Sequence, residues 1–260
     1  MKPYFTLPLL FSLIFCCNSC KDTKSTKQKE KENDAIEEIQ RAADKMKADQ
    51  AKAIEKDGGI SGDPKSMDGM IEATKKLEEV STGDEAKSAK VMRIFMQSIQ
   101  TDMAEITKQQ QNLVEGTNYS NVKTAADLDA LSNKVKLYQT ANATLMNKVK
   151  SGWEQSLRSG LAKEGVKQSY TTSFMRGVKT GLDKNKPHLL VIRQTDDEMC
   201  QAILAQHAVL KKYLGKWKWN AAEGAPDFQD NAALQAYNAQ AVKIQNASTR
   251  QLEAQKKVVQ

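Results

Sequence analysis

Residues 125–149 read AADLDALSNKVKLYQTANATLMNKV, and this stretch decides the fold class. One set of residues recurs at alternating intervals of three and four, which is the spacing of one face of an α-helix. This face consists of Leu128, Leu131, Val135, Tyr138, Asn142, Leu145 and Val149. We therefore predict a long helix that buries the face against neighbouring helices of a bundle. A dimeric coiled coil is the alternative, although the seam is short for one.

One position on this face is polar. Asn142 interrupts the apolar seam, and a polar side chain there costs stability unless it finds a hydrogen-bond partner. Such a residue also fixes the alignment of a helix with its neighbour. We therefore expect Asn142 to hydrogen-bond to another helix of the bundle.

Helical spacing continues on both sides of this stretch. Trp153, Leu157 and Leu161 extend its apolar face towards the C-terminus. The other segments with helical spacing are 33–56, 63–83, 84–116, 168–182, 187–215 and 231–260. Pro187 is interpreted as the start of its helix, because proline is favoured in a first turn. The sequence as a whole predicts an all-α protein that forms an elongated helical bundle.

Residues 216–230 differ from the helical segments. The sequence KWKW at 216–219 alternates basic and aromatic side chains, as a short strand does, and Gly224 and Pro226 suit a turn. We predict a small hairpin or ordered loop here, with both indoles on one face.

The first twenty residues have a composition of their own. A charged Met1-Lys2 precedes an apolar run of about 14 residues that ends at Cys17. A helix that crosses a bilayer needs ~20 apolar residues, so this run is too short for a permanent span. The layout is typical of a signal peptide that directs export and is then removed.

The end of this run resembles the lipobox of bacterial lipoproteins. Cys20 follows the small residue Ser19, as in that motif, and Cys17, with Ile14 three residues before it, is the alternative. The resemblance implies cleavage before the cysteine and a diacylglycerol lipid on its sulfur. It also implies a place in a bacterial cell envelope, for which we expect the outer membrane, facing the periplasm or the cell surface. An ordinary cleaved signal peptide and an uncleaved interfacial anchor are the other readings.

These features divide the chain into four parts. We predict a signal peptide over 1–19, a lipidated cysteine with a flexible tether over 20–32, a helical arm over 33–83 and a helical bundle domain over 84–260. The tether is predicted because residues 21–32 contain no apolar side chain.

A second resemblance lies near the C-terminus. Its residues are Trp219-Asn220, Phe228, Asn231, Leu234 and Tyr237-Asn238. The pattern is similar to that of an uncharacterised family of helical lipoproteins in the enteric bacterial envelope, and it covers roughly 45 of the 260 residues. It implies an envelope location and identifies no catalytic residue.

The chain is basic, with a formal net charge of +7. Residues 167–218 hold ten Lys and Arg against four acidic residues. A concentrated basic region suits anionic lipid, glycan phosphates or an acidic protein, whereas a plain solvated surface is the alternative.

Aromatic and basic residues come together at the predicted hairpin. The candidate ligand-binding residues are Lys216, Trp217, Lys218, Trp219 and Phe228. Flat rings beside cations suit an anionic glycan or a lipid. The alternative is that the indoles cap the end of the bundle while the lysines stay in water.

Residue types that carry catalysis are sparse. His188 and His207 are the two histidines and lack metal-ligand spacing, so we predict no metal site, no cofactor and no enzymatic activity. His207 is expected to be a hydrogen-bonded core or boundary residue. The acidic residues 196–198 fan apart by ~100° each on a helix, so we interpret them as a charged outer face. Cys200 lies far from the other three cysteines and is expected to be a buried thiol.

These observations favour a non-enzymatic, lipid-anchored envelope protein that binds another macromolecule. Long helices with short connections offer rigid faces for contact with a protein partner, and an exported location argues against nucleic acid. One alternative is a glycan- or lipid-binding module that uses the Trp/Lys residues of the hairpin. Another is an immunity or inhibitor lipoprotein that neutralises a toxin.

Overall fold

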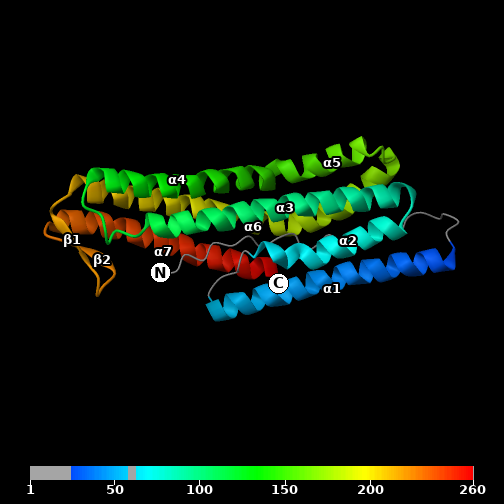
Figure 1. Cartoon of the computed structure of the whole chain (residues 1–260), viewed down its shortest axis with the longest axis horizontal. Coiled ribbons are helices and arrows are strands. Elements are labelled where there is room, and N and C mark those ends of the chain that lie inside the picture. Colours follow the sequence, from blue (N-terminus) through cyan, green and yellow to red (C-terminus); the bar gives the residue numbers. More distant parts are fainter. Residues whose placement is uncertain (1–24, 58–62, 260) are drawn as a thin grey trace.

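Long helices that run along one axis give the molecule an elongated shape (Figure 1). The computed structural model describes residues 25–57 and 63–259. Its helical elements are α1 Thr26–Asp57, η1 Pro64–Met67, α2 Asp68–Val80, α3 Gly83–Gly116, α4 Ala125–Asn147, η2 Lys148–Gly152, α5 Trp153–Lys163, α6 Gln168–Lys212 and α7 Asn231–Val259. Its strands are β1 Trp217–Asn220 and β2 Ala225–Phe228. The predicted all-α bundle is confirmed.

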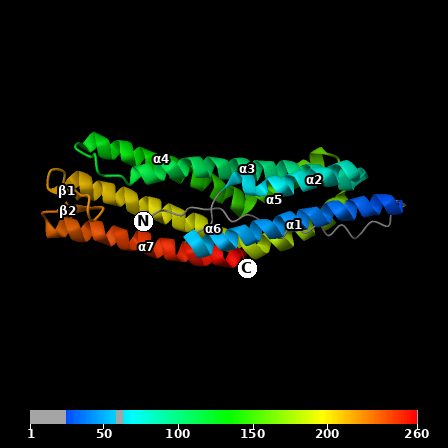
Figure 2. The same cartoon turned by 60° about the horizontal axis from the view of Figure 1, so that its bottom comes forward.

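Helices that follow one another along the chain are also neighbours in space. α2 packs between α1 and α3, α4 packs between α3 and α6, and α6 packs between α4 and α7. The last helix, α7, returns to contact α1. Figure 2 shows α1 and α7 along the same side of the bundle, where they overlap near its middle. The chain thus closes a circuit of helix contacts around a main core, with two smaller apolar clusters beside it.

The core is rich in methionine. Eight methionines belong to its main cluster, from Met46 in α1 to Met199 in α6. The thioether side chain is unbranched and fills irregular gaps between helices. Phe95 meets Trp153 edge to face with ring centroids 6.3 Å apart, an arrangement that aromatic pairs favour.

The apolar face of α4 is buried as its spacing predicts. The buried residues of this helix are Leu128, Val135, Tyr138, Asn142 and Leu145. Nδ2 of Asn142 donates a hydrogen bond to the backbone carbonyl of Arg193 in α6 at 2.8 Å. The expected partner of Asn142 is therefore found. Since α3 and α6 of the same chain pack against α4, the face serves the bundle within one molecule.

A π-helical turn, η2, joins α4 to α5. A π-helical turn accommodates an extra residue relative to an α-helix and so rotates the helix that follows. Trp153 and Leu157 of α5 consequently still face the core. Across this turn, Nζ of Lys186 in α6 donates to the backbone carbonyl of Lys150 at 2.5 Å.

Helix α1 begins earlier than the sequence suggests. The predicted flexible tether over 20–32 is wrong for residues 26–32, which form the first turns of α1. The side chain of Gln28 donates a hydrogen bond to the backbone carbonyl of Val80 at the end of α2. A polar contact of this kind holds the start of α1, and a search for apolar residues misses it.

The predicted signal peptide over 1–19 and the candidate lipidation sites Cys20 and Cys17 lie outside the described residues. Within the part of the chain that the structure describes, none of the helices combines the length and the apolar composition that crossing a membrane requires.

The segments predicted as two helices, 168–182 and 187–215, belong to one continuous helix, α6. Pro187 lies inside α6, so the prediction that it begins a helix is wrong. Proline lacks the N–H that would bond to the carbonyl four residues earlier, at Asp183. Asp183 and Pro187 are both exposed, so the carbonyl of Asp183 faces water. Leu189, on the opposite face of the helix, is buried. Packing on the buried face therefore keeps the helix continuous.

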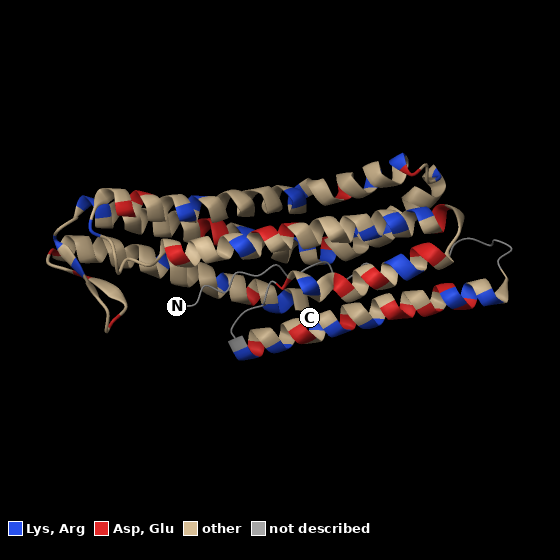
Figure 3. Ribbon diagram, viewed as in Figure 1, with Lys and Arg blue, Asp and Glu red and all other residues tan. Residues whose placement is uncertain are grey.

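The basic residues over 167–218 do not form one patch. They are distributed along α6, which is ~67 Å long for its 45 residues. Nζ of Lys211 pairs with Asp129 of α4 at 2.8 Å, and Arg193 is fully buried. Figure 3 shows the positions of basic residues interspersed with those of acidic residues along the helices of the bundle.

The predicted hairpin is confirmed. β1 and β2 pair antiparallel, with Trp217 opposite Phe228 and Trp219 opposite Pro226. Gly224 in the connecting turn has φ of 62°, a left-handed conformation that favours glycine. The hairpin lies at the end of the bundle where α6 leads into α7 (Figure 1).

Candidate interaction groove

The tryptophans predicted to bind a ligand pack against the end of the bundle. Trp217 is only 8% exposed, and its Nε1 donates to the backbone carbonyl of Leu210 at 3.0 Å. Trp219 is half-buried, and its ring lies edge-on to that of Tyr119 with centroids 6.1 Å apart. The indoles therefore cover the end of the core.

The other predicted residues complete this cap. The ring of Phe228 lies 5.6 Å from that of Tyr237 in α7, and Lys216 and Lys218 are exposed. The five predicted residues are thus brought together, with the aromatic rings against the bundle and the lysines in solvent. This arrangement matches the alternative in which the hairpin caps the helices.

His207 is a core residue, as expected. Its Nε2 lies 3.0 Å from the carbonyl of Gly116 in α3, and its Nδ1 lies 2.8 Å from Oγ of Ser132 in α4. Because a carbonyl only accepts, Nε2 carries the proton and donates to Gly116. Burial lowers the pKa of His207 to about 4, so the imidazole is neutral at physiological pH. The ring joins three helices near the hairpin end.

Asp196 lies in the core and not on the predicted outer face. Arg193 and Asp196 both have fully buried side chains, and they form an ion pair with Nη2 of Arg193 2.8 Å from Oδ2 of Asp196. The interpretation of residues 196–198 as an outer face is therefore wrong for Asp196. Its position three residues after Arg193 places the two side chains on one face of α6. Cys200, one turn further on, is buried as predicted.

Side chains from α4 and α7 complete the surroundings of this ion pair. Burial raises the pKa of Asp196 to about 6, against the opposing effects of Arg193 and of hydrogen bonds from Gln251 and Tyr138. Nε2 of Gln251 in α7 donates to Oδ1 of Asp196 at 2.5 Å. The ion pair of α6 is thus linked to α4 and α7. Because it is buried, either charge without its partner would lower the stability of the fold.

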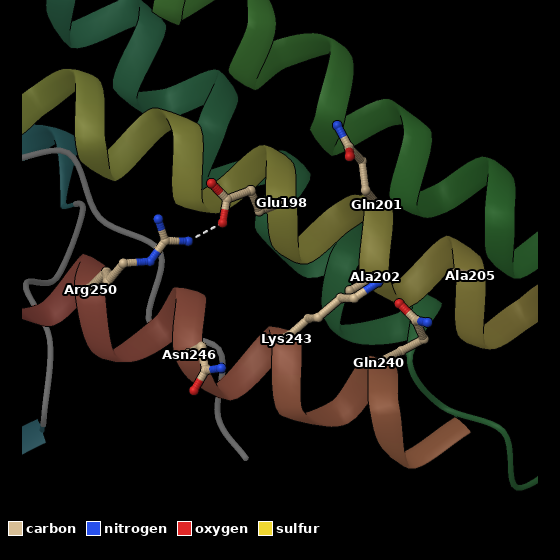
Figure 4. Close-up of a pocket in the computed structure, with 8 residues that line it drawn as sticks. All are labelled: Glu198, Gln201, Ala202, Ala205, Gln240, Lys243, Asn246 and Arg250. Atoms are coloured by element: carbon tan, nitrogen blue, oxygen red, sulfur yellow. Dashed lines mark hydrogen bonds and ion pairs between the residues drawn. The ribbon is translucent and has the colours of Figure 1, made fainter. Parts of the chain in front are cut away.

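A groove of about 580 Å³ runs between α6 and α7 close to this ion pair (Figure 4). Its lining residues are Glu198, Gln201, Ala202 and Ala205 of α6 and Gln240, Lys243, Asn246 and Arg250 of α7. The two alanines leave space because their side chains are small. Arg250 pairs with Glu198 across one end of the groove (Figure 4).

The polar side chains of the groove are of two kinds. Gln240 and Asn246 carry amides, each of which can both donate and accept hydrogen bonds, whereas the amide nitrogen of Gln201 already donates to Asp197 at 2.7 Å. Lys243 extends from α7 towards α6, and it has no ion-pair partner among the described residues (Figure 4). The groove therefore offers peptide-like hydrogen-bonding groups together with one unpaired positive charge.

Sequence reasoning missed the groove because no motif marks it. Each lining residue is of a type that is ordinary on an exposed helix face. The available signal was the scarcity of large apolar side chains on α7, whose buried contacts include Ala233, Ala247 and Ala254. Small contact residues leave two helices with fewer side chains to fill the space between them.

Among the described residues, no three His, Cys, Asp or Glu side chains gather closely enough to hold a metal ion. Comparison of the chain with protein-family models, curated proteins and solved structures finds no match.

Proposed function

We propose that this protein is a non-enzymatic envelope protein, anchored by a lipid on Cys20 or alternatively Cys17, that binds a protein partner in the α6–α7 groove. The observation that carries the proposal is the groove, which is open to solvent and lined by two long helices. Its amides match the donors and acceptors of a polypeptide. The unpaired Lys243 favours a carboxylate on the partner.

The groove is a better candidate than the Trp/Lys residues of the hairpin. The glycan- or lipid-binding reading needs accessible rings, whereas Trp217 is buried and its indole N–H is already hydrogen-bonded within the chain. The groove instead presents polar groups in solvent, as the binding surfaces of interaction proteins do.

A crosslinking pull-down of the full-length protein from its native envelope tests the binding. We expect Lys243→Glu to lose the partner that the unchanged protein retains, because the reversed charge repels a carboxylate. Lys136→Glu, the same change on the exposed surface of α4, is the matched control and retains the partner. Equal retention by both variants would contradict the groove as the binding site. Loss on replacing Lys216 and Lys218 instead would move the site to the hairpin.

The anchor is tested separately by metabolic labelling with palmitate and by membrane fractionation. We expect Cys20→Ala to abolish lipid incorporation and Cys17→Ala to leave it intact, because Ser19 precedes Cys20 as the lipobox requires. The reverse result would assign the lipid to Cys17. Absence of label from the unchanged protein would remove the lipid anchor from the proposal.

A further inference from the structure

One end of the bundle gathers three segments that are far apart in the sequence. We call it the anchor end and define it by Thr26 at the start of α1, the α2–α3 connection at 81–82 and the α5–α6 connection at 164–167. The hairpin lies at the opposite end, beyond Lys212 of α6 (Figure 1). The two ends are separated by the ~67 Å of α6.

Contacts between side chains and backbone hold the anchor end together. Gln28 of α1 donates to the carbonyl of Val80, and Nζ of Lys87 in α3 donates to the carbonyl of Gly165 at 3.2 Å. These contacts join α1 to α2 and α3 to the α5–α6 connection.

The chain between the proposed lipid and this face is short. Thr26 follows Cys20 by six residues, and an extended chain of that length spans at most ~20 Å. If Cys17 carries the lipid instead, the limit rises to ~30 Å. Either distance is well below the length of α6, so the lipid keeps the anchor end close to the bilayer.

The charges at the anchor end suit an anionic surface. Five exposed lysines are found there: Lys27, Lys29, Lys31, Lys163 and Lys167. The acidic side chains nearby are the exposed Glu30 and Glu79, the buried Glu32, the half-buried Asp84 and Glu85, Glu164, and Glu78, which pairs with Arg93 at 2.7 Å. Glu164 is neutralised by Lys90 at 2.9 Å. Lysines close to an anionic bilayer are attracted to its headgroups.

The long side of α1 is less suited to the same surface. Between residues 33 and 57 it carries seven acidic against five basic side chains. Figure 3 shows both signs along this helix. A molecule lying on α1 would bring more negative than positive charge to an anionic bilayer, whereas one standing on the anchor end brings exposed lysines.

We infer that the anchor end rests on anionic phospholipid headgroups, so that the bundle stands away from the membrane and presents the hairpin at its far end. This inference rests on the proposed lipid anchor. It places the groove residues Glu198–Ala205, which lie 30–37 residues along α6 from Gln168, at ~45–55 Å from the anchor end. A partner therefore meets the groove well away from the lipid surface.

Photocrosslinking of the full-length lipidated protein in vesicles tests this orientation. Benzoylphenylalanine replaces either Thr82 at the anchor end or Ala222 in the hairpin turn, both of which are exposed. The vesicles contain labelled phosphatidylglycerol. We expect lipid adducts from position 82 and a background level from position 222.

A charge-reversed pair separates headgroup attraction from simple tethering. Lys163→Glu combined with Lys167→Glu is expected to reduce the adduct at position 82 by roughly tenfold. The matched control, Lys216→Glu combined with Lys218→Glu at the hairpin, should leave it unchanged. An equal effect of both pairs would overturn the role of the anchor-end lysines.

Two further outcomes of the photocrosslinking experiment separate failure of the proposed orientation from failure of the proposed lipid anchor. Equal adducts at positions 82 and 222, or more at 222, on membrane-bound protein would overturn the orientation and leave the lipid anchor standing. A full-length protein that stays off the vesicles and carries no lipid would overturn the anchor and the orientation together.

Discussion

Helix α6 packs against α4 on one side and against α7 on the other, and the two interfaces use different side chains. α4 buries large residues such as Leu145 and Tyr138, whereas α7 buries mainly alanines and the amides Gln251 and Gln255. Burying a leucine contributes ~1.5–3 kcal/mol, and an alanine contributes less because it removes less apolar area from water. The α4 side therefore buries the larger apolar side chains, and the α7 side leaves room for a groove.

The largest loss of stability is expected when Arg193, the buried cation of α6, is replaced. Arg193→Met leaves Asp196 buried without its partner, and we expect a loss of ~3–5 kcal/mol in the free energy of unfolding at pH 7. Urea unfolding measures this loss.

The destabilisation caused by Arg193→Met should also depend on pH. The pKa of Asp196 is about 6 in the folded protein, above its ordinary value of 3.8, so its contribution to stability is present at low pH and is lost as pH rises through 6. Without Arg193 this loss grows, because the carboxylate has no cation beside it. Destabilisation should therefore be smaller at pH 5 than at pH 7. An equal loss at both values would show that the charge of Asp196 is not the cause.

The apolar interface is tested by Leu145→Ala. Leu145 is 2% exposed, and its truncation should cost ~2–5 kcal/mol through lost burial and the cavity left behind. Because α4 lies between α3 and α6, we expect the whole bundle to unfold at lower urea. A loss restricted to one helix would contradict the view that this interface supports the entire core.

The α7 interface should respond locally and by less. Gln251→Ala removes a hydrogen bond to Asp196, which should cost ~1–3 kcal/mol. Hydrogen exchange should accelerate in α7 and change little in α3 and α4. Gln245→Ala, an exposed position of α7, is the control and should leave exchange unchanged. Equal acceleration in every helix would remove the contrast between the two interfaces.

The smallest effect on stability is expected in the groove itself. Lys243→Glu changes an exposed side chain that has no ion-pair partner among the described residues, so the free energy of unfolding should stay within ~0.5 kcal/mol. Thermal unfolding compared with Lys136→Glu checks this. A large loss in Lys243→Glu alone would mean that its binding phenotype reports unfolding and not recognition.

The parts of the fold that were predictable from the sequence are those that local patterns of residues determine. The face of α4 and the hairpin follow local patterns of apolar, aromatic and turn residues, and both are confirmed. The start of α1 and the continuity of α6 through Pro187 depend on contacts with other helices, which no local pattern records. Tertiary packing overrides local propensity in both cases.

The candidate site was harder to predict than the fold. The hairpin residues stand out because tryptophan is rare in this chain, yet the structure uses Trp217 as part of the core. The groove exists because α7 has few large apolar side chains at its contacts with α6. The absence of large side chains does not form a sequence motif. Asp196 was missed because its partner, Arg193, becomes visible only when the two are placed on one face of a buried helix.

The circuit of helix contacts described above has a consequence for the order in which the chain folds. Almost every contact joins a helix to the next long one along the chain, and such local contacts favour rapid folding. The contact of α1 with α7 spans the longest stretch of chain, because it joins the first and last described helices. During synthesis, α1 and α2 can pair early, but the side of α1 that meets α7 must wait until the final helix has been made.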